Sequence, residues 1–527
     1  MIDTIVAGAR IFDGVDPTPF VTDLGIVGER IALIGDLSER DARERIDGSG
    51  RTLAPGFIDV HAHSDELWLA DGRCEGKIRQ GVTTEIGGNC GTSVAPLRGE
   101  AERRKAEEAA AVGVEIAWRD FDEFFAIVER NGVALNVASL VGLGTTRRAV
   151  RGDLEGRLDD AELEAECTLV RESIERGALG ISSGLIYVPS RYADERELHA
   201  CAAAARDAGM PRYATHLRSE GDDLLAAVDE ALDLGRDADV AVQLSHHKAA
   251  GKKNWGKVHR SLDAIARARA RGITANADAY PYVAMWTDLD TILPEDALHG
   301  GRDATLERLR DPETAVALAL RLQLERADEW HDIQISTVAS ERNASLAGMR
   351  LDEIASAWRL SPPRAALRLL LEERLAVEAI FFAMSEDDVA SVLSAGFVSI
   401  GSDASARSDR GPTAQGVPHP RTFGTFPRVF GRYVRGRHTL EIGEAIRRMT
   451  SLAADQFGIV DRGRIQIGAF ADLVLFDAER IVDTATYERP YQYPIGIDDV
   501  WVNGRAVVKN GETTGARPGK ALRGGRS

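Results

Sequence analysis

The middle of the chain alternates short apolar runs with longer amphipathic segments, and this alternation restricts the fold more than any other feature. The strand candidates are residues 56–64, 82–88, 134–142, 178–185, 211–219, 239–248, 273–280 and 397–403. Amphipathic helical segments such as residues 160–177, 195–209 and 259–272 separate several of them, and glycine closes these helices. Repeated strand–helix units form parallel sheets, and about eight units predict an α/β fold of the (β/α)8, TIM-like barrel type.

The sequence pattern is different at both ends of the chain, where short predicted strands are separated by glycine and proline turns. Strand-like runs lie at residues 3–12 and 24–35, and again at 471–480 and 498–512. We therefore expect a small β-sandwich domain built from residues 1–54 and 456–527, which encloses a central barrel over residues 55–455.

The segment of residues 285–375 is rich in Arg, Glu and Leu, and it is longer than one strand–helix unit requires. We interpret this segment as an insertion. It is either a lid over the functional site or a helical elaboration with only a structural role.

Composition excludes several classes of partner. The chain has 83 acidic and 65 basic residues, a net charge of -18, which argues against nucleic-acid binding. Four cysteines in 527 residues do not make a disulfide framework. We find neither a secretory signal nor an apolar run long enough to span a membrane, so we expect a cytoplasmic protein. The sequence is compatible with an oligomer but does not predict one.

Polar residues of a particular kind gather at the ends of the predicted strands. They are His61, His63, Cys90, His216, His246, His247, Lys248 and Asp403. Five of the 11 histidines of the chain fall in these stretches. Because the active site of a βα barrel is built at the carboxyl ends of its strands, we expect these side chains to meet.

The types of these residues point to a metal centre. Zinc takes thiolate and imidazole ligands, and a catalytic zinc keeps one position open for water. Cys90, His216 and His246 would supply three such ligands. Taken singly, Cys90 is equally well explained as an inert core residue, and each histidine as a hydrogen-bonded structural one.

His61 and His63 lie two residues apart and so share one face of an extended strand. With Asp403 they would hold a second, weaker ion or orient the water. Zinc lowers the pKa of its water and polarises a carbonyl, which indicates hydrolysis of an amide or related carbonyl. Asp403 is then the natural carrier of the proton from the water to the leaving nitrogen.

At these residues the sequence resembles the amidohydrolase superfamily and, more narrowly, the N-acyl-D-amino-acid deacylases (D-aminoacylases). The similarity extends over nearly the whole chain. It is carried by "LAPGFIDVHAHSD", "GVTTEIGGNCGTSVAPL", "SSGLIYVPS", "ATHLRSEGDDLLAAVDE", "LSHHKAAGKKNWG", "DAYPYVA", "IGSDA", "PHPRTFGTFPRVFGRYVR", "GRIQIGAFADLVLFD" and "VNGRAVV".

The resemblance implies one zinc held tightly by Cys90, His216 and His246. It also implies a weaker site at His61 and His63, and Asp403 as the catalytic acid/base. The stretch "GNCG" distinguishes these deacylases from hydantoinase-like relatives, which bridge two metals with a carboxylated lysine.

The resemblance further implies that basic and phenolic groups hold the free carboxylate of the substrate. Here these groups match Lys248, Tyr280 and Arg421. A surface charge or a salt bridge for the two cations and core packing for Tyr280 are the competing interpretations. Tyr187 and Tyr192, in "GLIYVPSRY", either line the pocket or are ordinary strand-end aromatics.

The sequence departs from the family pattern in two places near Asp403. Ala404 stands where the family usually has glycine, and "SARSDRGPTAQGV" lengthens the loop between Asp403 and "PHPR". Because this loop precedes Arg421, the departures affect the expected carboxylate anchor and the preferred side chain of the substrate.

The predicted function is zinc-dependent hydrolysis of a small molecule, an N-acyl-D-amino acid. A cyclic- or linear-amide amidohydrolase of the hydantoinase or dihydroorotase kind is the enzymatic alternative, but its bridging lysine has no counterpart at a strand end. A non-catalytic scaffold is the alternative from another class, and the complete set of metal-type residues weighs against it.

Overall fold

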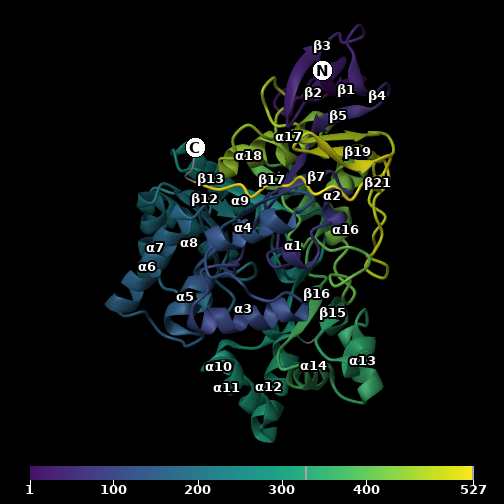
Figure 1. The fold of residues 1–527 in the computed structure, drawn as a ribbon. Helices are drawn as coiled ribbons and strands as arrows, with labels where there is room; N and C mark the ends of the chain where they lie inside the picture. The colour runs from purple at the N-terminus through teal and green to yellow at the C-terminus, as the bar shows by residue number, and fades with distance from the viewer. Residues whose placement is uncertain (327–328, 525–527) are drawn as a thin grey trace.

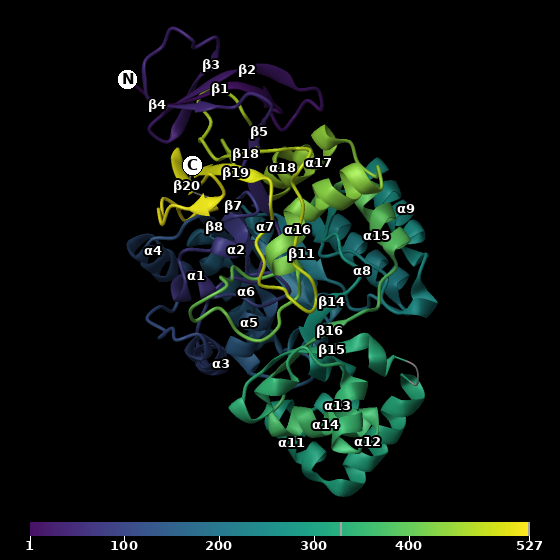
Figure 2. The same cartoon turned by 90° about the vertical axis from the view of Figure 1, so that its right-hand side faces the viewer.

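The computed structural model describes residues 1–326 and 329–524, which form a mixed α/β fold. Its parts follow one another along a long axis (Figure 1). The strands of the two termini lie at one end, and the helices between residues 295 and 372 lie at the opposite end. The view turned by 90° keeps this order, with the central strands and helices between the two ends (Figure 2).

A parallel strand lies within each of the eight predicted central runs. These strands are β6 (Phe57–Asp59), β7 (Val82–Gly87), β8 (Asn136–Ser139) with β9 (Val141–Gly142), β10 (Ile181–Gly184), β11 (Arg212–His216), β12 (Ala241–Leu244), β13 (Ala275–Ala279) and β17 (Val398–Ile400). β6, β7 and β8 pair in that order, and β9, β10, β11, β12, β13 and β17 form a second parallel sheet.

The two parallel sheets adjoin at both of their ends. Only Leu140 separates β8 from β9 along the chain. At the other end, Ala62 after β6 forms a parallel bridge with Ala404 after β17. The backbone N–H of Asp403 also donates to the carbonyl of His61 at 2.8 Å. The residues that follow β6 and β17 are therefore held side by side.

Helices follow the central strands, as the amphipathic pattern predicts. They are α1 (Leu67–Ala70), α2 (Glu75–Ile78), α3 (Gly99–Ala111), α4 (Phe121–Asn131), α5 (Leu143–Arg151), α6 (Asp160–Glu175), α7 (Glu195–Asp207), α8 (Leu224–Ala238), α9 (Lys257–Ala270), α15 (Glu386–Ser394), α16 (Arg421–Arg428), α17 (Ile442–Met449) and α18 (Ser451–Phe457). A capping box between Asp159 and Glu162 begins α6. Within the described ranges, no helix has the length and hydrophobicity that crossing a bilayer requires.

Strands from both termini pair in one sheet. They are β1 (Ile2–Ile11), β2 (Phe20–Val27), β3 (Arg30–Gly35), β4 (Ala42–Asp47), β5 (Thr52–Pro55), β18 (Leu473–Phe476), β19 (Ile497–Val502), β20 (Arg505–Lys509) and β21 (Glu512–Thr513). The antiparallel pairing of β5 with β18 joins the two ends of the chain. Leu53 and Leu473 then share one apolar cluster with Trp501, and burial of this cluster stabilises the association.

The segment predicted as an insertion has a sheet and a core of its own. It contains β14 (Met285–Asp288), β15 (Ile333–Val338), β16 (Val377–Phe381), α10 (Glu295–Leu298), α11 (Gly301–Arg310), α12 (Pro312–Glu325), α13 (Leu351–Trp358) and α14 (Pro362–Glu372). β16 pairs antiparallel with both β14 and β15. Leu289, Trp330 and Leu370 belong to an apolar cluster separate from that of the central strands. Both interpretations of this segment, a lid over the site and a helical elaboration with only a structural role, stay predictions.

A fully buried lysine connects residues in or directly after three of the central strands. Lys77 from α2 donates through Nζ to Asp59 at 2.7 Å and to Ser402 at 2.8 Å. The same ammonium lies 2.7 Å from Glu85 and donates to the carbonyl of Ala404 at 3.0 Å. These contacts satisfy the buried carboxylates and connect β6, β7 and the segment after β17.

Replacement of Lys77 by methionine is expected to destabilise the protein strongly. Removing one partner of a buried ion pair leaves uncompensated charge and costs about 3–5 kcal/mol. Lys253→Met is the matched control, because Lys253 pairs with Asp222 while 71% of its side chain is exposed. The exposed pair contributes at most about 1 kcal/mol. Thermal unfolding followed by circular dichroism should show a much larger decrease for Lys77→Met; equal decreases would contradict the role of the network.

Candidate metal centre

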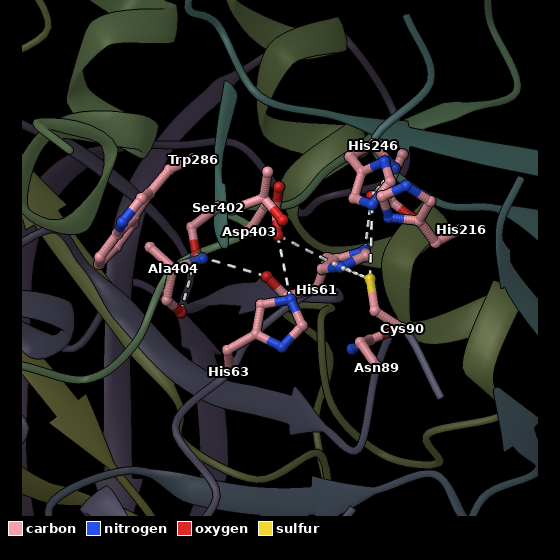
Figure 3. Close-up of polar contacts among 12 residues, drawn as sticks. His61, His63, Asn89, Cys90, His216, His246, Trp286, Ser402, Asp403 and Ala404 are labelled. Atoms are coloured by element: carbon pink, nitrogen blue, oxygen red, sulfur yellow. Dashed lines mark hydrogen bonds and ion pairs between the residues drawn. The ribbon is translucent and has the colours of Figure 1, made fainter. Parts of the chain in front are cut away.

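The predicted metal-type residues converge at the carboxyl ends of the central strands (Figure 3). Cys90 follows β7, His216 ends β11, His246 follows β12, and His61 follows β6. The Sγ atom of Cys90 lies 3.4 Å from Nε2 of His61 and 3.4 Å from Nε2 of His246. The rings of His216 and His246 are in contact, with centroids 4.4 Å apart. His247 instead faces Ser261 of α9 at 2.8 Å and points away from the centre.

Three residues of the centre have a left-handed backbone. The φ angles are 52° at Cys90, 35° at His246 and 52° at Asp403. Non-glycine residues adopt this conformation rarely and at a cost, and such residues cluster at functional sites. Each lies where its strand has just ended, so the turn directs the side chain into the space between the strands.

Asp403 stands at the centre of a second group of ligand-type side chains. Its Oδ1 atom lies 3.0 Å from Nε2 of His63 and 3.5 Å from Nε2 of His61. Its Oδ2 atom lies 2.9 Å from Nη1 of Arg421. His61 therefore belongs both to the cysteine group and to the aspartate group, and it connects them (Figure 3).

The charges of the site favour an ionised thiol and an ionised carboxyl group. Burial alone would raise the pKa of the Cys90 thiol, but the charges of His61 and His246 hold that pKa well below its ordinary value. Burial alone would likewise raise the pKa of the Asp403 carboxyl group. The guanidinium of Arg421, followed by His246, holds that pKa well below its usual range. A thiolate is the form of cysteine that binds zinc.

Two buried carboxylates at the site escaped the sequence analysis. Asp278 near the end of β13 lies 3.1 Å from Nδ1 of His61 and accepts the backbone N–H of His246 at 2.8 Å. Glu220, four residues after His216, lies 2.9 Å from Nδ1 of His246. Asp278 precedes Tyr280 by two residues at a strand end, so the rule that selected the histidines would also have selected it. Glu220 lies in a loop and has no comparable signal.

The residues expected to bind the substrate carboxylate surround the same centre. Arg421 begins α16 with its guanidinium 4.6 Å from the ring centre of Tyr280, so the lengthened loop still delivers Arg421 to the site. Its Nε atom is buried and has no hydrogen-bond partner within residues 1–326 and 329–524. Lys248 forms an ion pair with Glu220 and lies 5.8 Å from the ring centre of Tyr280.

The two candidate pocket tyrosines differ in their placement. The ring of Tyr187 lies 5.0 Å from that of His216, and its hydroxyl group is 2.8 Å from Thr287. Tyr192 instead has the ring of His299 as its aromatic neighbour, at 6.3 Å. The structure thus brings Tyr187 to the metal-type residues but gives Tyr192 no contact with them among the described residues.

The donor set fits zinc. Both ring nitrogens of His216 are buried and lack a hydrogen-bond partner among the residues that the structure describes. This is costly for a structural histidine but expected for a metal ligand. Three groups of donor atoms each lie within 4.8 Å of one another: His61, Cys90 and His246; His61, His63 and Asp403; and His216, Glu220 and His246. Thiolate and imidazole together suit zinc better than magnesium or calcium, which prefer oxygen ligands.

The sequence matches known hydrolases over nearly its full length. The amidohydrolase family model matches residues 44–508. N-acyl-D-glutamate deacylase of Alcaligenes xylosoxydans xylosoxydans is 37% identical over 524 residues, which are 99% of this chain and 96% of that protein. D-aminoacylase of the same organism is 36% identical over 522 residues, or 99% of this chain and 97% of that protein.

A solved structure has the same fold. The chain is similar to N-acyl-D-glutamate deacylase of Bordetella bronchiseptica with a TM-score of 0.85 and 34% identity, covering 99% of each chain. That enzyme was crystallised with zinc and with a phosphonate inhibitor that mimics the tetrahedral intermediate of its reaction.

Proposed function

The chain belongs to the amidohydrolase family, and on this premise we propose that it hydrolyses the amide bond of N-acyl-D-amino acids. The products are a carboxylate and a free D-amino acid. One observation carries the proposal: a buried thiolate and imidazole centre lies next to an aspartate whose second oxygen faces a buried arginine. The relatives named above, which act on N-acyl-D-glutamate or bear the name D-aminoacylase, support the same reaction.

Cys90, His216 and His246 would hold the tightly bound zinc. His61 and His63, together with Asp403, would hold a second and weaker ion. Bound zinc supplies Lewis-acid chemistry, lowering the pKa of water and polarising the amide carbonyl.

Asp403 would move the proton that hydrolysis requires. Its low pKa keeps the carboxylate ionised, so that Oδ1 can accept a proton from water. The protonated carboxyl group then delivers the proton to the leaving nitrogen. Arg421 on Oδ2 fixes the orientation of the carboxylate and leaves Oδ1 on the side of the histidines.

Arg421, Lys248 and Tyr280 would bind the free carboxylate of the substrate. The Nε atom of Arg421 is a donor without an acceptor in the described part of the chain, and a guanidinium binds carboxylates in a defined geometry. An anchor of this kind next to the metal ligands determines which enantiomer presents its amide to them. Tyr187, beside His216, would line the pocket, whereas the position of Tyr192 favours a structural role.

We also infer the architecture in more detail. The adjoining ends of the two parallel sheets favour a closed (β/α)8 barrel over residues 55–455, with an insertion around residues 285–375. The joined terminal strands support a small β-sandwich over residues 1–54 and 456–527. All four cysteines are free and buried, which agrees with a reducing, cytoplasmic location.

A hydrolysis screen with paired D- and L-N-acyl amino acids tests the proposal. With zinc, we expect release of the free amino acid from D-substrates at rates far above those from L-substrates. Removal of the metal by a chelator should abolish the reaction, and added zinc should restore it. Absence of hydrolysis from every N-acyl amino acid, with zinc bound, would refute the proposed function.

A further inference from the structure

Glu220 is a buried carboxylate that contacts both a candidate metal ligand and a candidate substrate anchor. It lies in the loop after β11, and only 9% of its side chain is exposed. Its Oε1 atom lies 2.9 Å from Nδ1 of His246 and also accepts a hydrogen bond from Nζ of Lys248. Its backbone carbonyl accepts the N–H of Ala250 at 2.8 Å, which fixes the loop against the segment after β12.

We propose that Glu220 is a positioning residue of the metal centre, which selects the tautomer of His246 and restrains Lys248. This inference rests on the proposed function. A histidine that binds a metal is a neutral imidazole with a single N–H group, so a proton on Nδ1 leaves Nε2 with a free lone pair. With Glu220 accepting from Nδ1, the lone pair of Nε2 points to Cys90, where a metal ion would bind.

Lys248 makes the negative charge of Glu220 necessary. The ammonium group of Lys248 lies 2.8 Å from Nδ1 of His246. An ammonium group can only donate, so a hydrogen bond from Lys248 to Nδ1 requires the imidazole proton to be on Nε2. With Glu220 removed, Lys248 is the remaining charged partner of Nδ1, and this tautomer is favoured. A proton on Nε2 blocks metal binding at that atom. Glu220 prevents this outcome, because its Oε1 atom is the stronger acceptor for both Lys248 and the imidazole N–H.

The arrangement at His61 supports this reading, because it repeats the same geometry. His61 also faces Cys90 through Nε2, and its Nδ1 lies 3.1 Å from the buried carboxylate of Asp278. A buried carboxylate thus lies within ion-pair distance of the far nitrogen of both histidines on the thiolate, although Nδ1 of His61 makes no hydrogen bond to the described residues. Histidines that bind metals generally have such a partner, and losing it weakens metal affinity about 10–100-fold.

Competition with a zinc chelator on the purified protein tests the role of Glu220 without any substrate. We expect Glu220→Gln to weaken zinc binding by about 10-fold or more, and Glu220→Ala by at least as much. Asp222→Asn is the matched control. Asp222 lies two residues after Glu220 and its side chain is 61% exposed, so this variant removes the same charge from an exposed position. Its zinc affinity should equal that of the unmodified protein. Equal affinity of Glu220→Gln and Asp222→Asn would overturn the proposal.

A double variant separates tautomer control from a general structural effect. If Lys248 competes for Nδ1, then Lys248→Met in the Glu220→Gln background should recover part of the lost zinc affinity. A further decrease would overturn the proposal. Zinc X-ray absorption should give the same sulfur and nitrogen ligands with and without Glu220, whereas loss of an oxygen ligand would make Glu220 a direct ligand and refute the positioning role.

The outcomes also distinguish this inference from the proposed function. Intact hydrolysis of N-acyl-D-amino acids with unchanged zinc affinity in Glu220→Gln would remove only the role of Glu220. Weakened zinc binding in a protein that hydrolyses no N-acyl amino acid would refute the deacylase function and retain the role of Glu220.

Discussion

Replacement of Cys90 by alanine is expected to remove tight zinc binding and nearly all hydrolysis of N-acyl-D-amino acids. The Cys90 thiolate is the only sulfur ligand proposed, and its Sγ lies 3.4 Å from two imidazole nitrogens. Its loss removes one of the three ligands proposed for the tight ion. It also removes the only negative charge among them, because the other two ligands are histidines. The zinc content measured by mass spectrometry should decrease from about one ion per chain to near zero.

Cys74→Ala provides the control for this experiment. Cys74 is also buried, and its φ of 48° is close to that of Cys90, but its Sγ donates to the carbonyl of Asp71. Backbone strain from alanine in the left-handed region is therefore matched in the two variants. Cys74→Ala should keep zinc and activity. If Cys90→Ala retained tight zinc, Cys90 would not be a ligand.

Replacement of Asp403 by asparagine is expected to retain the tightly bound zinc but to decrease kcat by roughly 10²–10⁴-fold, the usual contribution of a general acid/base. The three ligands proposed for the tight site remain, whereas the amide can neither take up nor release the proton. Asparagine tolerates the φ of 52° at this position, so the fold should be unaffected. Kinetics at saturating substrate, with zinc measured on the same samples, would separate the two effects.

Asp239→Asn is the matching control, because Asp239 has a φ of 54° and caps the C-terminal end of α8 on the surface. We expect no change in its kcat. Undiminished turnover in Asp403→Asn would assign the proton transfer to another group. Loss of zinc in that variant would instead place Asp403 among the essential ligands of the tight ion.

Most of the strands and helices could be predicted from the local pattern of the sequence. Each of the eight predicted runs holds a parallel strand, and nearly all residues of these strands are buried although several are polar. The predicted helix over residues 160–177 is α6, Asp160–Glu175, bounded by its capping box. Pairing between distant strands leaves no such local trace. The similar strand and turn patterns of the two termini predicted a shared domain, but not that β5 pairs with β18.

The site residues that could be predicted from the sequence are those of a rare type that lie at a defined position, the end of a strand. Histidines and a cysteine at strand ends are uncommon, and these led to His61, Cys90, His216 and His246. Carboxylates are common, with 83 Asp and Glu in the chain, so Glu220, which lies in a loop, did not stand out. Asp278 lies near a strand end, as Asp403 does, and could have been selected by its position. Their roles depend on distances to imidazole nitrogens, which the order of residues does not encode.

The sequence by itself determined the α/β alternation, the metal-type residues and the family resemblance. The tertiary structure decided which of these residues contact one another. His61 contacts both Cys90 and Asp403, Arg421 pairs with Asp403, and His247 contacts Ser261 of α9 instead of the metal-type residues. The physical reason is that strand and helix patterns arise from neighbours along the chain. Charge pairing inside a buried site depends instead on groups from separate strands and loops that meet only in the folded protein.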